Sequence, residues 1–204
     1  MSARTEPARV VPWTAVAGWC LLGAAPVVVA LARNVADLTI PTTAAALVLG
    51  AAAGTGLDDP AHATVAAVPV PLSERRLVRL GWVLVAVAAT ALVLATAIAA
   101  RDARVEATAL HLAALAVATG ATSVAIAGRT SPDVAHGTPG VAGSGGALLC
   151  VVTLSALAQR VDWLPNPADS GHTGRWWLVA AAASLAALGS FRDPAARTRT
   201  APWR

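Results

Sequence analysis

The residues that could do chemistry are few in this chain, and their spacing does not favour a metal or haem site. The four histidines are His62, His111, His136 and His172. No two of them have the i, i+4 spacing that places two ligands on one helix face. His111 alone falls inside a predicted membrane span, where ionisable residues are candidates for function. Its position near the outer end of that span favours a hydrogen-bonding role, with Glu106 or water as partners.

The other reactive groups are isolated as well. Cys20 and Cys150 each lie in an apolar run without a second Cys at C-x-x-C spacing, so both are interpreted as small core residues. Ser144, in "GVAGSGGA", lacks the motif of an intramembrane serine protease, and the sixth apolar run offers no His to activate it. Asp58 and Asp59 point in different directions if helical, which favours a helix cap plus a solvated charge over a cation site.

The absence of Lys excludes further chemistry. A Walker A loop needs a Lys for the nucleotide phosphates, and a Schiff base needs one as nucleophile, but all 15 basic residues are Arg. The sequence therefore predicts that the chain is not an enzyme and holds no cofactor. ATP hydrolysis is excluded on this chain.

The composition indicates a protein whose solvent is lipid. Only 13% of the 204 residues are charged and 56% are hydrophobic, mostly Ala, Val and Leu in long runs. This is too little charge to cover a soluble particle, for which about 25% is usual. The net charge of +4 comes from arginines that flank apolar runs, which indicates topology and contact with anionic lipid rather than nucleic acid.

The apolar runs predict an all-α polytopic membrane protein with a single transmembrane domain over residues 1–204. The predicted spans are 13–32, 38–57, 77–100, 107–127, 142–158 and 176–191. The first is interpreted as a retained span because it lacks a convincing signal-peptide cleavage site. The second contains mostly small residues, so we expect it to pack inside the bundle.

The arginines predict the orientation of these spans. Six spans place ten arginines on the side of the termini and five on the other side, namely Arg33, Arg101, Arg104, Arg160 and Arg175. The positive-inside rule therefore predicts a multi-pass protein with both termini in the cytoplasm.

The most distinctive segment is "LDDPAHATVAAVPVPLSERRLVRL", residues 57–80, between the second and third spans. Asp59 followed by Pro60 indicates the start of a short helix. Pro69 and Pro71 must end that helix, because proline cannot donate a backbone hydrogen bond and disfavours helix just before it. The segment thus predicts a short helix outside the membrane between two spanning helices. An ordinary loop with caps and positive-inside arginines remains the alternative.

This arrangement resembles the membrane subunit of type-2 ABC exporters, in which a short cytoplasmic coupling helix lies between spans two and three. The resemblance covers the whole chain in topology but only about 25 residues in motif. Its matching positions are Asp58, Asp59, Thr64, Pro69, Val70, Pro71, Arg75 and Arg76. The chain departs from the family before span one, where Pro7 and Pro12 disfavour the usual amphipathic helix.

The resemblance implies a permease in a bacterial plasma membrane that works with a separate ATPase, which would hold ATP and Mg²⁺. The residues that it implies for docking are Asp58, Asp59, Thr64, Val65, Val68, Leu72, Arg75 and Arg76. It also implies a homodimer or a heterodimer with a related permease, with substrate passing between the copies along small residues of spans two and five. The link 161–175 matches the place of short re-entrant helices, which Pro165 and Pro167 leave open.

Two other classes of protein compete with this interpretation. A small membrane enzyme would need paired acidic or His residues within one leaflet, and the predicted spans contain almost none. An accessory or scaffold membrane protein would bind a partner without transport. An adjacent ATPase gene would favour the exporter over the scaffold.

Overall fold

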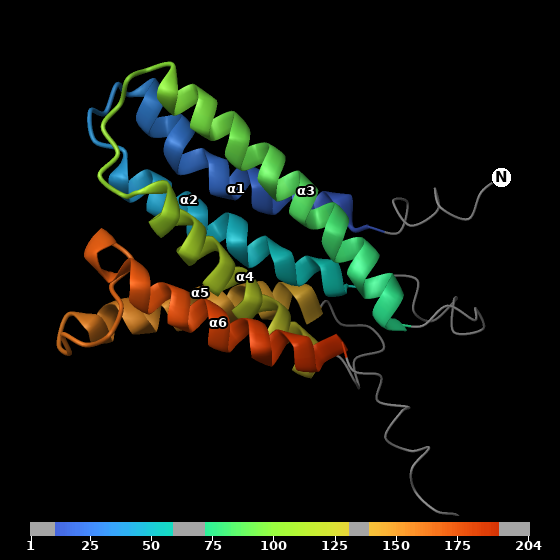
Figure 1. Ribbon diagram of the computed structural model, residues 1–204. Coiled ribbons are helices and arrows are strands. Elements are labelled where there is room, and N and C mark those ends of the chain that lie inside the picture. Colours follow the sequence, from blue (N-terminus) through green and yellow to red (C-terminus); the bar gives the residue numbers. More distant parts are fainter. Residues whose placement is uncertain (1–10, 59–71, 131–138, 192–204) are drawn as a thin grey trace, which may run out of the picture.

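A computed structural model describes residues 11–58, 72–130 and 139–191 of the chain (Figure 1). The described residues confirm the predicted all-α class, since they contain no strand apart from one isolated bridge between Asp37 and Arg104. They form six α-helices: α1 (Trp13–Ala32), α2 (Thr39–Ala51), α3 (Leu72–Ala99), α4 (Ala109–Thr130), α5 (Pro139–Ala158) and α6 (Thr173–Leu188). The short 3₁₀ helices η2 (Ala52–Leu57), η3 (Ser170–His172) and η4 (Gly189–Phe191) complete them.

The six helices run alternately up and down in one bundle (Figure 1). We call the end of the bundle where α1, α3 and α5 begin the terminal end, because the first helix, α1, begins there and the last, α6, ends there. The opposite end, called the loop end, holds the links 33–38, 100–108 and 159–172. The segment 59–71, which contains four of the eight predicted docking residues, lies outside the described residues. The helices on either side of it, α2–η2 and α3, end and begin at the terminal end.

Five helical segments are long and apolar enough to cross a membrane, which is compatible with a multi-pass membrane protein. They include α1, α4, α5, most of α3 and the combined α2–η2 helix, Thr39–Leu57. The helix α6 has 16 residues, begins with Thr173 and carries Arg175 in its first turn, and it falls outside this set. The described fold therefore supports five spans by length and composition.

The second helix lies in the interior, as predicted from its small residues. Of the most apolar 18-residue stretch of Thr39–Leu57, 67% is buried inside the protein, whereas the corresponding share for Arg76–Ala99 is 11%. Close backbone contacts explain the difference: a Cβ atom on Gly50 would lie 2.4 Å from the Ala116 carbonyl oxygen, and one on Gly143 would lie 2.5 Å from that of Ser123. Only glycine permits α2, α4 and α5 to approach this closely.

Several helices extend beyond the predicted apolar spans. The helix α3 begins at Leu72 rather than at 77, because a helix can continue through charged residues where the apolar pattern stops. The helix α5 begins at Pro139, a residue suited to the first helical position. Cys20 is half-buried, but Cys150 is exposed on α5, so the expectation that both cysteines lie in the core is wrong for Cys150.

Candidate functional site

The predicted docking residues divide into three groups in the structure. Asp58 and Arg76 are described in full and both are buried, with exposed fractions of 6% and 9%. Leu72 and Arg75 belong to the first turn of α3. The remaining four residues, Asp59, Thr64, Val65 and Val68, lie outside the described residues. The structure thus defines the two ends of the predicted docking segment and how they attach to the bundle.

Asp58 joins the end of the second helix to the beginning of the fifth. Its Oδ1 accepts a hydrogen bond of 2.6 Å from the backbone N–H of Gly140, in the first turn of α5. The first N–H groups of a helix have no partner within the helix and favour a negative charge nearby, so the Asp58 carboxyl caps α5. Gly140 is required here, because a Cβ atom would lie 2.5 Å from Thr55 Cα and 2.7 Å from Asp58 Oδ2.

Arg79 joins the third helix to the same point. Its guanidinium donates a hydrogen bond of 2.8 Å to the backbone carbonyl of Asp58, and its side chain is only 3% exposed. We call Asp58, Arg79 and Gly140 the Asp58 cluster. Arg76, one of the predicted docking residues on the same helix, is buried as well. The cluster connects η2, α3 and α5 where the segment 59–71 begins.

Burial controls the protonation of the Asp58 carboxyl. Removal from water raises its pKa above the ordinary value, because burial penalises the charged form. The Gly140 N–H and the positive charge of Arg79 act in the opposite direction, but burial outweighs them. The carboxyl is therefore easier to neutralise than an exposed aspartate.

A second polar contact fixes the point where the second helix changes from α to 3₁₀ geometry. The hydroxyls of Ser123 and Ser144 both donate to the backbone carbonyl of Ala51, at 2.8 and 2.7 Å. Both side chains are fully buried and their oxygens are 3.4 Å apart. We call these three residues the Ala51 cluster. The two serines, one from α4 and one from α5, thereby hold the last α-helical carbonyl before η2.

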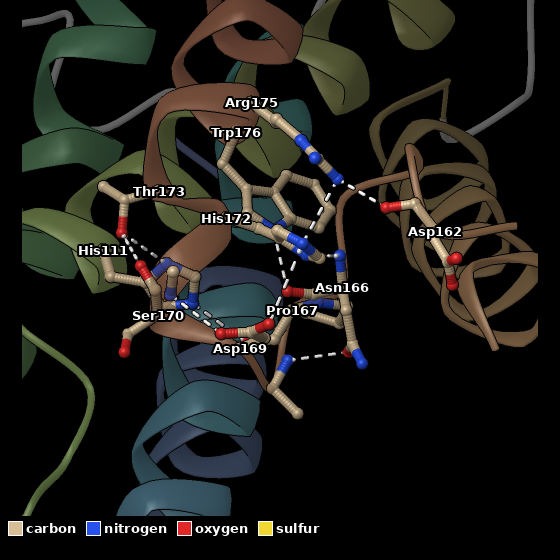
Figure 2. Close-up of polar contacts among 12 residues, drawn as sticks. His111, Asp162, Asn166, Pro167, Asp169, Ser170, His172, Thr173, Arg175 and Trp176 are labelled. Atoms are coloured by element: carbon tan, nitrogen blue, oxygen red, sulfur yellow. Dashed lines mark hydrogen bonds and ion pairs between the residues drawn. The ribbon is translucent and has the colours of Figure 1, made fainter.

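The loop end contains a third polar cluster, centred on His111 (Figure 2). His111 is fully buried, and its Nε2 lies 3.0 Å from the Pro167 carbonyl oxygen while its Nδ1 lies 3.1 Å from Thr173 Oγ1. A carbonyl oxygen can only accept, so Nε2 must carry a proton. The expected hydrogen-bonding role of His111 is confirmed, but its partners belong to the α5–α6 link and α6 rather than being Glu106 or water.

The same link is tied to α6 by further hydrogen bonds (Figure 2). Trp176 Nε1 donates to the Asn166 carbonyl at 3.2 Å, and Arg175 donates to the Asp162 carbonyl at 2.6 Å. Between α5 and α6 the chain forms turns and the three-residue η3, so this link contains no re-entrant helix. His111 and Trp176 hold the link against α4 and α6.

None of these three clusters combines several potential metal ligands. Within the ranges 11–58, 72–130 and 139–191, no three His, Cys, Asp or Glu side chains lie close enough to share a metal ion. His62 and His136 lie outside these ranges. The arrangement instead connects helices at both ends of the bundle.

Sequence reasoning identified Asp58 and His111 but missed Ser123, and it considered Ser144 only as a protease nucleophile rather than as a contact to Ala51. The available signal was the occurrence of a Ser on each of two apolar helices, at Ser123 and Ser144. Comparisons with protein family models, with curated proteins and with solved structures found no match to this chain.

Proposed function

We propose that this chain is the permease subunit of an exporter in a bacterial plasma membrane, driven by a separate ATP-binding-cassette ATPase. Two features support the proposal. Five helices are suited to crossing a membrane, and a distinctive proline-rich segment, 59–71, connects α2–η2 to α3 at the terminal end of the bundle. In the proposed orientation this end is cytoplasmic, where an ATPase would bind.

The Asp58 cluster is the observation that supports this function best. A segment that transmits force must be attached rigidly at both ends, or its movement is absorbed in the attachments. Asp58 immediately precedes the segment and Arg79 lies in the first turns of the helix that follows it, and the two are hydrogen-bonded to each other. The bond from Gly140 extends this connection to α5. A displacement of the segment would therefore move three helices together.

The route of the substrate is proposed to lie between two copies of the chain or between this chain and a related permease. The inner helices α2, α4 and α5 touch through backbone atoms at Gly50, Gly120 and Gly143. This close contact favours a route outside the single bundle. The exposed apolar surface of α3 and of α5 offers area for a second subunit or for lipid.

The docking face is proposed to include Val65, Val68 and Leu72, with Arg75 beside it. The test is affinity purification of the tagged full-length chain from its native membranes, followed by mass spectrometry. We expect a P-loop ATPase to co-purify with the wild type and to be lost from the Val65→Asp/Val68→Asp variant. The matched control is Val35→Asp, an exposed valine in the 33–38 link at the opposite end, which should retain the ATPase.

Arg76 is unsuitable for this test, because its side chain is buried and a Glu there would disturb the bundle itself. Arg75→Glu is the appropriate charge reversal. Purification of the chain alone, or with partners other than an ATPase, from mild detergent would contradict the exporter proposal.

The alternative is an accessory or scaffold membrane protein that binds a partner without transport. The close backbone contacts among α2, α4 and α5 favour this alternative, because a rigid bundle is suited to holding a partner-binding surface in place. Under this alternative the same purification yields a stable partner without a nucleotide-binding domain, and the loss of binding would map to a different surface.

A further inference from the structure

A surface cavity at the loop end has properties that the proposed function does not use. It has a volume of about 430 Å³ and lies between the 33–38 link and the residues that connect α3 to α4. This volume falls within the range of small-ligand sites. Its polar lining consists of Asn34, Asp37, Arg101, Asp102 and Arg104, with Leu31 as an apolar contact.

The walls of the cavity are fixed by backbone contacts between the two links. The Leu38 N–H donates to the Arg104 carbonyl at 3.0 Å, and the Arg104 N–H donates to the Ala36 carbonyl at 3.2 Å. Asn34 and Asp102 both adopt the left-handed conformation, with φ of 53°, which Asn and Asp tolerate better than most residues. The cavity therefore exists before any ligand binds, which reduces the entropic cost of binding.

Charges of both signs line this cavity. Arg101 donates to Asn34 Oδ1 at 2.6 Å and to the Leu31 carbonyl at 3.3 Å through one nitrogen, which leaves its other N–H groups available. Within the part of the chain that the structure describes, the Arg104 guanidinium and the Asp102 carboxylate make no hydrogen bond or ion pair. Hydrogen bonds from Thr39 lower the pKa of the Asp37 carboxyl, and the positive charge of the nearby Arg104 also acts to lower it, so this group stays negative at neutral pH.

A ligand that complements this lining must itself carry both charges. A simple anion would be repelled by the two carboxylates, and a simple cation by the two guanidinium groups. We propose that the cavity binds a zwitterion with a phosphate and a primary ammonium, the phosphoethanolamine group. Arg101 and Arg104 contact the phosphate, and Asp37 and Asp102 accept hydrogen bonds from the ammonium.

The cavity lies where four helices end, at the level that lipid head groups would occupy if the helices cross a bilayer. The phosphoethanolamine group can therefore come from phosphatidylethanolamine in the membrane or from a soluble molecule. Phosphatidylcholine serves as a comparison because its quaternary ammonium has no N–H to donate. Phosphatidylglycerol lacks the positive charge entirely.

The test is native mass spectrometry of the full-length chain released from detergent in an equimolar mixture of these three lipids. We expect preferential retention of phosphatidylethanolamine. Arg104→Gln and Asp102→Asn should each reduce its retention about fivefold, which corresponds to the upper end of the range for an exposed ion pair. Asn preserves the left-handed conformation at position 102, and both variants keep the backbone contacts of the links.

Matched controls at the same end are Arg160→Gln and Asp162→Asn, whose side chains are exposed outside the cavity and should leave retention unchanged. Competition by soluble phosphoethanolamine distinguishes the two sources. If it displaces the lipid at equal concentration, the site takes a soluble zwitterion; if it does not, the site takes the lipid head group. Equal retention of the three lipids, or equal loss in the cavity and control variants, would overturn the proposal.

Discussion

Replacement of Gly54 by Ala tests the packing of the second helix most sharply. Gly54 lies in η2, and a Cβ atom at this position would lie 2.1 Å from Ser123 Oγ, 3.1 Å from the Gly140 carbonyl oxygen and 3.2 Å from Ser144 Oγ. Favourable contact distances are roughly 3.5 Å or more between heavy atoms. The added methyl would therefore force η2 and the two serines apart by about 1 Å and weaken their hydrogen bonds to Ala51.

The magnitude follows from two opposing effects. An Ala in place of Gly inside a helix normally stabilises it by up to about 1 kcal/mol. An extra methyl in a filled interior costs about 1–3 kcal/mol, and loss of one hydrogen bond at the Ala51 cluster adds about 1 kcal/mol. We therefore expect Gly54→Ala to lower the free energy of unfolding by about 2 kcal/mol, measured by denaturant titration in mixed micelles.

The matched control for this change is Gly145→Ala on α5, where an added Cβ atom meets no heavy atom within 4 Å. This variant should be neutral or more stable than the wild type. Ser123→Ala removes the closest obstructing atom, so the double variant Gly54→Ala/Ser123→Ala should lose less stability than the sum of the single variants, by about 1 kcal/mol. Wild-type stability of Gly54→Ala, or strict additivity with Ser123→Ala, would refute the placement of Gly54 against Ser123.

Two further changes test the ends of the bundle. Asp58→Ala should lower the free energy of unfolding by about 1–2 kcal/mol through loss of the α5 cap, whereas Asp58→Asn keeps an acceptor for the Gly140 N–H and should cost less. Because burial raises the pKa of Asp58 in the folded state, the pH-dependent part of its contribution to the free energy of unfolding is largest at acid pH. That part is lost as the pH rises through the raised value, and Asp58→Asn, which cannot ionise, should flatten the decline in the same titration. His111→Ala should lower the free energy of unfolding by about 2–4 kcal/mol, because it leaves the Pro167 carbonyl without its partner and creates a cavity. Leu110→Ala, at an exposed neighbouring position, should have little effect in the same titration.

The helices themselves could be predicted because their signal is local. An apolar run of 20 residues defines α1, and its predicted bounds of 13 and 32 agree with Trp13–Ala32. Pro26 does not interrupt this helix. The interior position of α2 could also be predicted, because a helix built from small residues gains more from close helix contacts than from lipid.

The polar contacts between helices could not be predicted from the sequence. Asp58 was predicted as a docking residue, and the helix cap was predicted at Asp59. The contact that Asp58 makes with Gly140 spans 82 positions and depends on how α2 and α5 meet. Ser123 and Ser144 appear in the sequence only as single polar residues in apolar runs. Their shared acceptor is a backbone carbonyl, which leaves no trace in residue types. His111 is similar, since one partner is the Pro167 carbonyl.

Photo-crosslinking from within the segment 59–71 tests the proposed ATPase partnership most directly. Benzoylphenylalanine placed at position 68 of the full-length chain, in its native membranes, is expected to form an adduct with a P-loop ATPase on illumination. The same group at position 92, where Leu92 is exposed on α3, should form no such adduct. Adducts with the ATPase at 68 alone would support the permease proposal. Adducts at 68 only with lipid or with proteins that lack a nucleotide-binding domain would contradict it.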